Sequence, residues 1–507
     1  MLAKVGSVTL WGIEGVPVEV EVDIGRGLPG ISVVGLPDPA VKESRDRLKP
    51  AIKNSGFEFP NRKTVVNLAP ADLKKEGPSF DLPIALGMLS AGESVRLPEM
   101  KDSFFVGELA LDGSVRPVRG VLPMALKLAE KPGRRFVVPL PNADEAGVVP
   151  GIEVFPVGSL RECVEFLEGK RGIQPHRVEV EEVFRRRREY PVDFREVKGQ
   201  GFAKRAIEVA VAGGHNILMV GSPGGGKTML ASRIPTILPS LTLDEALQIT
   251  RIHSAAGILK EGFVATRPFR APHHSVSNVA LIGGGNIPGP GEVSLAHNGV
   301  LFLDELPEFR RDALEALRQP MEDGKVAVSR AKGRMEFPAR FLLVAAMNPC
   351  PCGWLGDRSH SCHCTVAQIL AYRRKISGPL LDRIDIHIEV SSVPASVLMR
   401  EREEEPSEEV RRRVEECRKI QEERFRAEGI FFNGHMNAGQ IKRYCVMTEK
   451  AKEMLEEALK VMNFSARAYD KVRKVARTIA DLAGSEVIQP EHIAEAVNYR
   501  SLDRESW

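Results

Sequence analysis

Apolar positions along this chain follow two periods, and the change between them divides the sequence into parts. Over residues 1–165, segments such as PVEVEVDI alternate polar and apolar residues, as half-buried strands do. DLPIALGMLSAG is apolar enough to predict a buried helix. GELALDGSVRPVRG predicts two strands joined by a turn. The first part is therefore predicted to be an α+β domain.

Three further parts follow along the chain. Residues 166–193 are charged, contain prolines and show weak periodicity, so we interpret them as a linker. Residues 194–393 place helices after buried strands, which is typical of an α/β domain. Residues 394–507 are charge-rich and predict long helices, of which the first looks mostly solvated. The expected fold class is α/β, with a helical C-terminal domain.

The segment NILMVGSPGGGKT has the strongest chemical signature in the chain. It fits G-x-x-x-x-G-K-[ST] directly after a predicted strand and before a predicted helix, which is the context that a P-loop requires. Its backbone N–H groups would wrap the phosphates of ATP. Lys227 is expected to reach the β- and γ-phosphates, and Thr228 to hold Mg²⁺. The predicted nucleotide-binding residues are Gly221, Ser222, Pro223, Gly224, Gly225, Gly226, Lys227 and Thr228.

Two later strands supply the other groups that ATP hydrolysis needs. GVLFLDEL is a buried strand that ends in Asp304 and Glu305. Asp304 is expected to bind Mg²⁺, and Glu305 to orient and deprotonate the attacking water. The strand RFLLVAAMN ends at Asn348, whose amide could help to position that water. Together the three segments predict a Mg²⁺-dependent ATPase.

Composition and charge narrow the setting. Hydrophobic residues make up 43% of the chain and charged residues 27%, as in an ordinary globular protein. The net charge of +3 neither requires nor excludes a nucleic-acid partner. We see no apolar run of about 18 residues and no signal-peptide pattern at the start, so no membrane span and a cytoplasmic location are expected.

Four of the seven cysteines cluster in the segment CPCGWLGDRSHSCHC, within a loop over residues 349–364. The pairs Cys350-x-Cys352 and Cys362-x-Cys364 are nine residues apart. Four thiolates on one loop could bind Zn²⁺ tetrahedrally, although zinc sites usually have longer spacing within each pair. A reduced cysteine-rich loop without metal is the alternative.

The P-loop, LFLDE, Asn348 and the later GPLLDRIDIHIEV together resemble an AAA+ ATPase of the magnesium-chelatase-like branch. More closely, RPFRAPHHSVSNVALIGGG, NPCPCG and SGPLLDRIDIHIEV resemble the ComM/YifB family, over nearly the whole chain. The resemblance implies a homohexameric ring with a C-terminal helical lid, which moves along DNA and promotes branch migration in natural transformation. It also implies that Arg383 is an arginine finger and Arg467 a sensor arginine of the lid, because a guanidinium can stabilise the transferring phosphoryl group.

Two features could contact nucleic acid. KVAVSRAKGRMEFPARF predicts a hairpin before the Asn348 strand, with Arg330, Lys332 and Arg334 at its tip. Three cations on a projecting loop suit phosphate contact without base readout. The segment between the P-loop and LFLDE contains His273 and His274, which could bind metal but more readily suit a structural or interface role.

The segment VNLAPADLKKEGPSFDLPIALG resembles the region around the catalytic serine of Lon proteases, which share a ribosomal-S5-type fold. A serine–lysine dyad would make Ser79 a nucleophile. Carried over from the Lon pattern, the lysine position falls on Met124, and Lys127 lies one helical turn further on. Protease activity is therefore not expected, although Lys74 and Lys75 lie nearby in sequence. A chelatase-type ATPase subunit and an ATP-dependent serine protease remain the alternatives.

Overall fold

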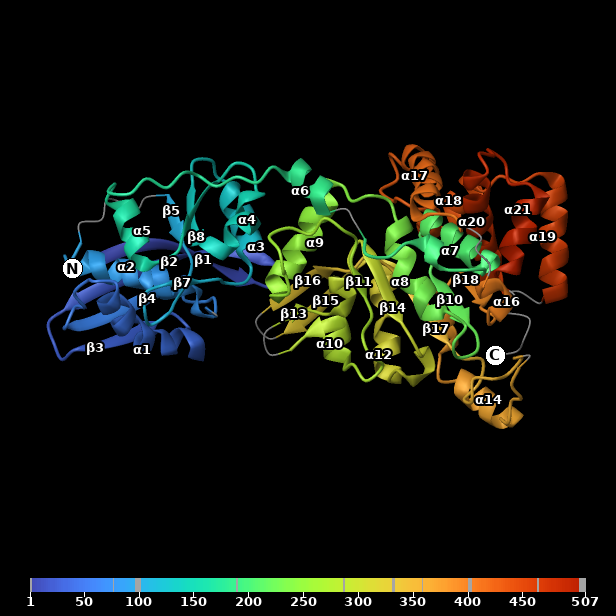
Figure 1. Ribbon diagram of the computed structural model, residues 1–507, viewed down its shortest axis with the longest axis horizontal. Coiled ribbons are helices and arrows are strands. Elements are labelled where there is room, and N and C mark those ends of the chain that lie inside the picture. The colour runs from blue at the N-terminus through green and yellow to red at the C-terminus, as the bar shows by residue number, and fades with distance from the viewer. Residues whose placement is uncertain are drawn as a thin grey trace. The chain divides into compact units, whose positions relative to one another are not determined.

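The computed structural model describes residues 2–75, 77–95, 102–187, 190–285, 288–330, 333–357, 359–399, 404–462 and 465–500. The chain forms two compact units. Unit 1 comprises Met1–Arg188 and Leu243–Ala265, and unit 2 comprises Glu189–Thr242 and Thr266–Trp507. Each is described by itself below (Figure 1).

Unit 1 is built on a seven-stranded mixed sheet in the order β3-β4-β2-β1-β5-β8-β9. The long β1 and β2 form an antiparallel hairpin, whereas β5, β8 and β9 run parallel. The strands of this sheet are β1 Leu2–Trp11, β2 Glu14–Gly25, β3 Gly30–Val34, β4 Lys63–Ala69, β5 Ser103–Phe105, β8 Arg135–Pro139 and β9 Glu153–Val157. A separate pair, β6 Glu108–Leu109 and β7 Val115–Arg116, matches the predicted two-stranded turn.

Helix α2 forms the centre of the unit 1 core. All of its residues but Ser90 are buried, as its nearly continuous apolar sequence predicts. It packs on β1 and β2, and a Cβ at Gly87 would approach the Val22 side chain to 2.5 Å, so glycine permits the close contact. The helices of unit 1 are α1 Pro39–Asn54, α2 Asp81–Ala91, α3 Val121–Ala129, α4 Ala143–Gly147, α5 Leu160–Leu167, α6 Val180–Arg187 and α9 Leu243–Ala256.

Two of these helices were not anticipated in unit 1. Helix α6 lies inside the segment 166–193, which we interpreted as a linker. Helix α9 follows the P-loop helix in sequence, inside the predicted core 194–393, yet it clusters with unit 1. Its Ser254 hydroxyl donates to the carboxylate of Glu145, a buried residue of α4 whose pKa is raised by burial. This contact joins residues 109 positions apart in sequence, which the hydrophobic pattern of one segment does not reveal.

Unit 2 contains a five-stranded parallel sheet in the order β11-β14-β17-β10-β18. Strands β10 and β14 are buried at every position, because helices cover both faces of a parallel sheet. The strands are β10 Ile217–Val220, β11 Phe269–Arg270, β14 Gly299–Leu303, β17 Phe341–Met347 and β18 Ile386–Glu389. The mixed α/β fold with a parallel sheet confirms the predicted fold class.

Two small hairpins and a set of helices complete unit 2. The hairpins pair β12 Gly283–Gly284 with β13 Gly289–Pro290, and β15 Lys325–Arg330 with β16 Gly333–Pro338. The helices around the sheet are α7 Gly201–Gly213, α8 Lys227–Ile237, α10 Asn278–Ile282, α11 Glu292–Leu295, α12 Arg311–Ala316, α13 Arg318–Asp323, α14 Val366–Arg373, α15 Gly378–Leu381 and α16 Ala395–Leu398.

The C-terminal part of unit 2 is helical, as predicted. Its helices are α17 Ser407–Arg424, α18 Ala438–Tyr444, α19 Glu449–Met462, α20 Ala466–Leu482 and α21 Pro490–Asn498. Helix α17 is less solvated than its charge density suggests, because Val410, Val414 and Cys417 form a buried row that packs on α7, α8 and α20. Within the described residues, no helix has the length and apolar character needed to cross a bilayer.

Candidate nucleotide-binding site

The P-loop connects β10 to α8 at the carboxyl edge of the parallel sheet (Figure 1). Two of its glycines are required by geometry. A Cβ at Gly221 would collide with the carbonyl oxygen of Val390, and Gly226 has a φ of 86°, in the left-handed region. The loop therefore runs close to the neighbouring β18 side of the sheet, with its backbone N–H groups leading into the first turn of α8. This is the local geometry that cradles phosphate.

Lys227, the first residue of α8, is buried and faces back into the loop. Its ammonium group donates to the carbonyl oxygens of Gly221 at 2.6 Å and Ser222 at 2.9 Å. It also donates to Oδ1 of Asn348 at 3.3 Å. Burial lowers the pKa of Lys227, and the charge of Asp304 opposes that change. The predicted phosphate-binding lysine and the predicted Asn348 are thus brought together.

Thr228 and Asp304 meet across the same edge. The Thr228 hydroxyl donates to Oδ2 of Asp304 at 2.8 Å, and the other Asp304 oxygen accepts from the backbone N–H of Glu305 at 2.9 Å. Neighbouring ligands of an octahedral Mg²⁺ ion lie about 2.9 Å apart. The two oxygens therefore fit a Mg²⁺ ion in both chemistry and spacing.

Glu305 follows Asp304 and adopts a left-handed backbone conformation, with a φ of 53°. Its carboxylate contacts His274, with Oε2 lying 3.3 Å from Nδ1 of the imidazole. The sheet register explains this contact, because Arg270 of β11 is paired with Leu301 of β14 and both chains continue four residues further. Sequence reasoning missed this role of His274, although the pairing of the two strands would have placed it opposite Glu305.

Asn348 directly follows β17, the strand that lies between β14 and β10. Besides accepting from Lys227, it is held through its backbone, which hydrogen-bonds the hydroxyl of Tyr372 on α14. Burial raises the pKa of Tyr372 to about 12, and the bond from Asn348 opposes that rise. Since β10, β14 and β17 are adjacent in the sheet, their carboxyl ends bring the three predicted motifs to one place.

The sulfur atoms of Cys350, Cys352, Cys362 and Cys364 all lie within 4.8 Å of one another. Sγ of Cys350 is 3.4 Å from that of Cys352 and 3.7 Å from that of Cys362. Such distances exceed a disulfide bond of about 2.05 Å, and they resemble the edge of about 3.8 Å in a tetrahedron with Zn–S bonds of about 2.3 Å. Backbone N–H groups of Trp354 and His363 lower the pKa of the Cys352 thiol to about 6. The four thiols therefore form a compact soft-ligand cluster.

The two predicted functional arginines both form ion pairs within unit 2. The Arg383 guanidinium contacts the carboxylate of Glu322 on α13 and donates to the Pro379 carbonyl oxygen at 2.6 Å. It also lines a cavity of about 720 Å³ beside α10, α13 and β15. Arg467, at the start of α20, lies 2.6 Å from Asp382 and its side chain is 70% exposed. Asp382 and Arg383 are thus neighbours in one turn. Arg383 pairs with Glu322 of α13, and Asp382 pairs with Arg467 of α20.

A buried polar network behind this turn joins helix α20 to the parallel sheet. The Lys471 ammonium of α20 donates to the carbonyl of Ile384 at 2.8 Å and lies 3.4 Å from the Asp385 carboxylate. The other Asp385 oxygen lies 3.3 Å from Nδ1 of His215, which precedes β10. Burial lowers the pKa of Lys471 to about 8. Burial alone would raise the pKa of Asp385, but Lys471 and His215 hold it well below its usual range.

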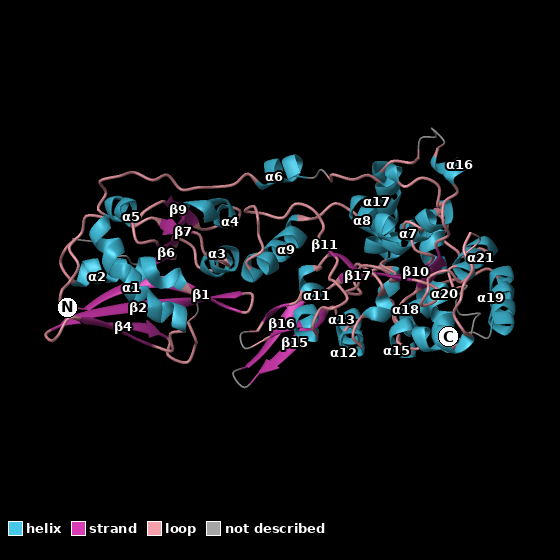
Figure 2. Cartoon of the chain, turned by 60° about the horizontal axis from the view of Figure 1, so that its bottom comes forward, coloured by secondary structure: helices cyan, strands magenta, loops and turns pink. Residues whose placement is uncertain are grey.

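The predicted basic hairpin is present as β15 and β16, which extend away from the five-stranded sheet in Figure 2. Arg330 ends β15, its side chain lies outside the described part, and Lys332 lies outside the described residues. Arg334 is exposed and pairs with Glu336 at 3.1 Å, as does Lys325 at 2.8 Å. Glu336 therefore offsets part of the positive charge on the described strands, and its pKa is lowered by Lys325.

The Ser79 region of unit 1 has a structural explanation. Ser79 lies buried in a short 3-10 helix, Pro78–Phe80, and its carbonyl oxygen accepts from the Gly107 N–H at 2.9 Å. Asp81, at the start of α2, accepts from the Arg47 guanidinium at 3.0 Å. Burial raises the pKa of Asp81, with Arg47 opposing that change. The serine and aspartate of this segment thus help to anchor α2.

Lysines near Ser79 in sequence or by family pattern have other partners. Met124, which stands at the lysine position of the Lon pattern, is 2% exposed in α3. Lys127 pairs with Glu130 at 2.7 Å on the surface. The buried Lys75 ammonium donates to the carbonyl oxygen of Pro70, and burial lowers its pKa. These contacts give no support to a serine–lysine dyad at Ser79.

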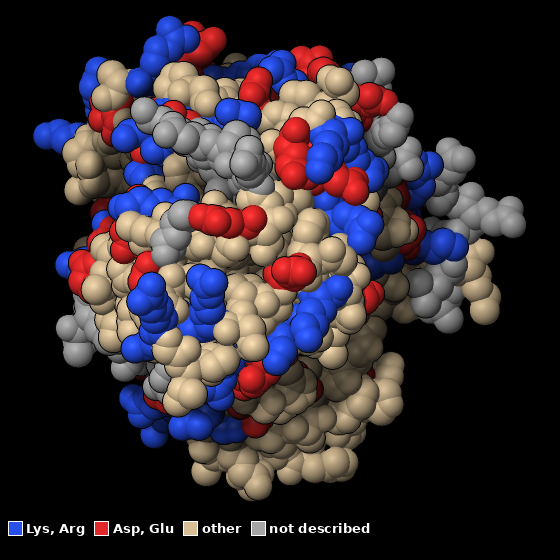
Figure 3. All heavy atoms as spheres, turned by 90° about the vertical axis from the view of Figure 1, so that its left-hand side faces the viewer, with Lys and Arg blue, Asp and Glu red and all other residues tan. Residues whose placement is uncertain are grey.

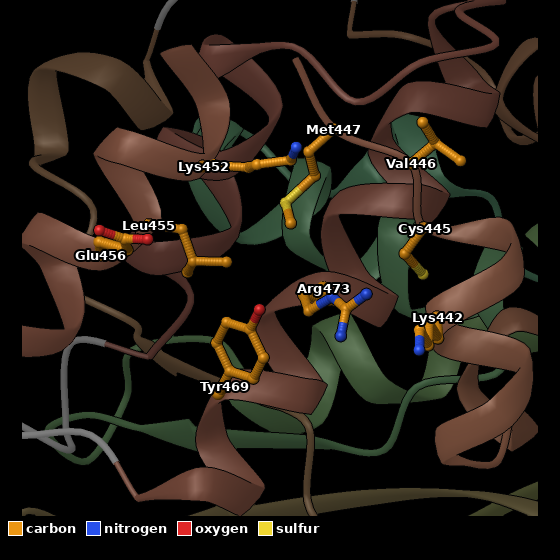
Figure 4. Close-up of a pocket in the computed structure, with 9 residues that line it drawn as sticks. All are labelled: Lys442, Cys445, Val446, Met447, Lys452, Leu455, Glu456, Tyr469 and Arg473. Carbon is orange, nitrogen blue, oxygen red and sulfur yellow. The ribbon is translucent and has the colours of Figure 1, made fainter. Parts of the chain in front are cut away.

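The surface face in Figure 3 and the cavity in Figure 4 do not indicate a particular ligand. On the face in Figure 3, basic and acidic side chains are intermixed, and neither sign covers it. A cavity of about 440 Å³ lies among the C-terminal helices α18, α19 and α20 (Figure 4) and shares no lining residue with the nucleotide site. Its lining residues are Lys442, Cys445, Val446, Met447, Lys452, Leu455, Glu456, Tyr469 and Arg473.

Comparison with known protein families agrees with this geometry. Residues 193–398 match the family described as magnesium chelatase, subunit ChlI, and residues 404–500 match its C-terminal part. Residues 20–142 match a family described as subunit ChlI of Mg-chelatase. The fold and the site therefore define a magnesium-chelatase-like AAA+ ATPase, a class that uses ATP and Mg²⁺.

Full-length relatives narrow the assignment. The chain is 44% identical to YifB of Escherichia coli, over 97% of this chain and 96% of that protein. It is 44% identical to the competence protein ComM of Haemophilus influenzae, over 99% of this chain and 98% of that protein. The chain belongs to the ComM/YifB family. A partial match, 26% identical over 28% of the chain and 27% of the relative, is to Lon protease 2 of Bacillus subtilis, in keeping with the Lon-like similarity of the N-terminal region.

Proposed function

We propose that the protein is a hexameric DNA motor that uses ATP hydrolysis to promote branch migration during recombination of incoming DNA in the cytoplasm. The observation that carries the ATP part is the convergence of Lys227, Asn348 and the Thr228–Asp304 pair at one sheet edge. In this site, Lys227 and the P-loop would hold the phosphates, Thr228 and Asp304 would hold Mg²⁺, and Glu305 would activate the water.

The DNA part of the proposal is supported by family and by shape. The relative from Haemophilus influenzae is named a competence protein, and competence concerns DNA that enters the cell. The β15–β16 hairpin supplies a projecting ribbon (Figure 2), in which Arg330 pairs with Gly333 and Arg334 pairs with Ser329. Lys332, which lies outside the described residues, falls between the two strands in sequence. Such cations suit sequence-independent phosphate contact. We therefore propose single-stranded or branched DNA as the substrate.

The ring is supported by Arg383. In this proposal its guanidinium leaves Glu322 and reaches the γ-phosphate bound to a neighbouring subunit, while Arg467 of the lid acts within its own subunit. An arginine supplied by a neighbour requires contact between subunits, and head-to-tail contacts form a ring when the rotation between subunits closes. Six subunits are the number that the family resemblance implies.

We also propose that Cys350, Cys352, Cys362 and Cys364 bind one Zn²⁺ ion. The sulfur-to-sulfur distances of 3.4–3.7 Å among the first three match the expected tetrahedral edge. His360 is not included among the ligands, because the four thiols already supply a tetrahedral set. Its imidazole instead stacks on Trp354 and lies 3.4 Å from Asp357. Four thiolates are one of the usual donor sets of structural zinc sites.

A chelatase-type role is the alternative function, because the matching families are named for magnesium chelatase. The family matches in unit 1 and in unit 2 both carry the magnesium-chelatase name. The presence of unit 1 therefore does not exclude a chelatase-type role. Identity of 44% over nearly the full length of the relative named a competence protein favours the DNA motor. A chelatase role predicts ATPase turnover that responds to a porphyrin substrate and partner subunits, and not to DNA.

The test is an ATPase assay of the full chain with and without single-stranded, double-stranded and branched DNA, followed by strand displacement on three- and four-way junctions. The proposal expects DNA to stimulate turnover and junctions to be resolved in an ATP-dependent way. Glu305→Gln is the inactive control. If no form of DNA changes the rate of ATP turnover and no junction is resolved, the DNA motor is refuted, whereas the ATPase activity is not.

The hairpin is tested separately. Replacing Arg330, Lys332 and Arg334 with alanine should weaken DNA binding and flatten its salt dependence by roughly one unit of log–log slope per lost phosphate contact, while sparing basal ATPase. A matched control replaces Lys419, Lys450 and Lys460, three exposed lysines of the lid helices. Equal loss of DNA binding in both triple variants would show that net charge, and not the hairpin, governs binding.

A further inference from the structure

We infer that the four-cysteine centre is a structural part of the ATP site, in which bound zinc holds the P-loop and Asn348 in their working positions. The inference rests on the zinc assignment proposed above and adds a role for that metal in nucleotide binding. It concerns the cysteine loop, residues 349–364, which connects β17 to α14.

Both ends of the cysteine loop are anchored at the same place. The loop begins after Asn348, whose side chain accepts from the P-loop lysine Lys227. It ends at Thr365, which caps α14 through a reciprocal hydrogen-bond pair with Gln368. Two turns further along α14, the Tyr372 hydroxyl returns to the backbone of Asn348. The conformation of the cysteine loop therefore influences the position of Asn348, which contacts Lys227.

The same loop touches two successive residues of the P-loop. Gly353 lies against Pro223, so closely that a Cβ on Gly353 would approach the proline ring to 2.7 Å. The carboxylate of Asp357 accepts a hydrogen bond from the side chain of Ser222. It also accepts from the backbone N–H of Ser359 at 2.8 Å, which lowers the pKa of Asp357. One side of the phosphate cradle thus rests on the cysteine loop.

The cysteine loop has little apolar surface with which to hold its own shape. Within its described residues there is neither helix nor strand, and Cys350 is the only cysteine of the four that is buried. Segments too small to form a hydrophobic core are commonly stabilised by a metal cross-link. Reduced thiols are weak hydrogen-bond donors and cannot replace that cross-link. Zinc would therefore fix the positions of Gly353 and Asp357, and through them the P-loop.

The consequence for function follows from the geometry of phosphate binding. The P-loop works by aiming several backbone N–H groups at fixed phosphate positions. Misplacement of catalytic groups by about 1 Å can cost on the order of a hundredfold in rate. Loss of the metal should therefore weaken nucleotide binding and turnover even though no cysteine is a predicted phosphate ligand.

The first experiment compares the full-length wild type with the double variant Cys352→Ser, Cys362→Ser. Zinc is measured by plasma mass spectrometry, and affinity by titration with a fluorescent ADP analogue in the presence of Mg²⁺. We expect about one zinc per wild-type chain and little in the variant, because a structural zinc site needs four ligands and the variant keeps only two of the four thiolates. We expect the variant to bind the analogue at least about tenfold more weakly. Circular dichroism verifies that the variant is folded.

A second pair of variants leaves all four cysteines in place. Gly353 and Gly356 have φ values of 87° and 77°, so alanine strains the backbone similarly at both. A Cβ at Gly353 meets Pro223, whereas a Cβ at Gly356 meets nothing within 4 Å. We expect Gly353→Ala to retain zinc and lose affinity for the ADP analogue, and Gly356→Ala to retain both.

The outcomes separate the two proposals. A wild-type chain without zinc refutes the zinc assignment and with it this inference. Zinc in the wild type, lost in the double variant without any change in nucleotide affinity, refutes the inference and leaves the zinc assignment standing. Equal nucleotide affinity of Gly353→Ala and Gly356→Ala refutes the contact with Pro223 as the route from the cysteine loop to the P-loop.

Discussion

Nδ1 of His274 lies 3.3 Å from Oε2 of Glu305, the proposed base of the ATPase reaction. The two side chains follow neighbouring parallel strands at equal distances from the paired residues Arg270 and Leu301. A carboxylate that is engaged by an imidazole is less free to accept a proton from water. We therefore expect the contact with His274 to slow ATP hydrolysis.

Replacing His274 with alanine should release this restraint. We expect basal ATP turnover to rise roughly two- to fivefold, the factor that corresponds to an exposed polar contact worth less than about 1 kcal/mol. His273→Ala is the comparison variant, because the His273 ring bonds Ser275 and packs on the His274 ring at 4.0 Å, so a rise confined to His274→Ala assigns the effect to the contact with Glu305. A fall in turnover specific to His274→Ala would instead mean that the histidine orients Glu305 for catalysis.

Binding and hydrolysis of ATP should separate between Lys227 and Glu305. Lys227→Ala removes the buried ammonium that faces the P-loop, so nucleotide affinity should be lost. Glu305→Gln keeps the shape of the side chain but removes the base, so ATP should bind while turnover falls about 10²- to 10⁴-fold. Titration with a fluorescent ATP analogue and a phosphate-release assay measure the two effects. Normal turnover in Glu305→Gln would move the base to another residue.

Thr228 should determine the Mg²⁺ requirement. Thr228→Val removes the hydroxyl that bonds Asp304, so the Mg²⁺ concentration for half-maximal turnover should rise by about tenfold or more. Ser232→Ala, one turn later on α8, is the control, because the Ser232 hydroxyl donates to the Met229 carbonyl oxygen and accepts from the Arg233 guanidinium, neither of which belongs to the proposed metal site. An unchanged Mg²⁺ dependence in Thr228→Val would contradict the proposed metal site.

Arg383 should act between subunits. Arg383→Ala is expected to bind nucleotide normally but to lose about 10³-fold in turnover, as arginine fingers do. Mixing it with Glu305→Gln should restore part of the activity, because mixed rings contain sites with an intact Glu305 and a neighbour with an intact Arg383. Absence of any restoration from rings shown to be mixed would place the action of Arg383 within its own subunit.

The buried pair of Asp385 and Lys471 should control the stability of unit 2. Asp385→Asn leaves the Lys471 ammonium without its charged partner and should cost about 3–5 kcal/mol in urea unfolding. Because Lys471 and His215 hold the pKa of Asp385 below its unfolded value near 4, the contribution is present above that pH and is lost as the pH falls through the folded pKa. The difference between wild type and variant should therefore shrink below about pH 4.

An exposed acid on the same turn provides the control for that measurement. Asp382 pairs with Arg467 at 2.6 Å, but both side chains reach solvent. Asp382→Asn should therefore change the free energy of unfolding by less than about 1 kcal/mol. Similar costs for the two variants would show that burial of Asp385 does not govern its contribution.

The strands and the ATP-binding motif were predictable because their information is local. Runs such as GVLFL must be buried on both faces, and polar residues directly after such runs lie at the carboxyl edge of a parallel sheet. The P-loop likewise needs glycine at Gly226 for a left-handed backbone angle, which the sequence displays directly. The family resemblance, which the comparisons confirm, added the class of protein.

Other features depended on packing between distant segments. Charge density made α17 look solvated, yet its buried row of Val410, Val414 and Cys417 faces helices far away in sequence. Helix α9 follows the P-loop helix but packs with unit 1 through Ser254 and Glu145. Neither partner can be identified from the periodicity of one segment, because periodicity shows that a face is buried and not what covers it.

By itself, the sequence determined the parallel sheet, the P-loop, the strand-end residues Asp304, Glu305 and Asn348, and the cluster of four cysteines. These follow from short-range patterns whose chemistry and backbone geometry are set by neighbouring residues. Only the tertiary structure decided that His274 meets Glu305 and that the cysteine loop rests on the P-loop. Those contacts arise from strand register and chain return, which join residues far apart in sequence.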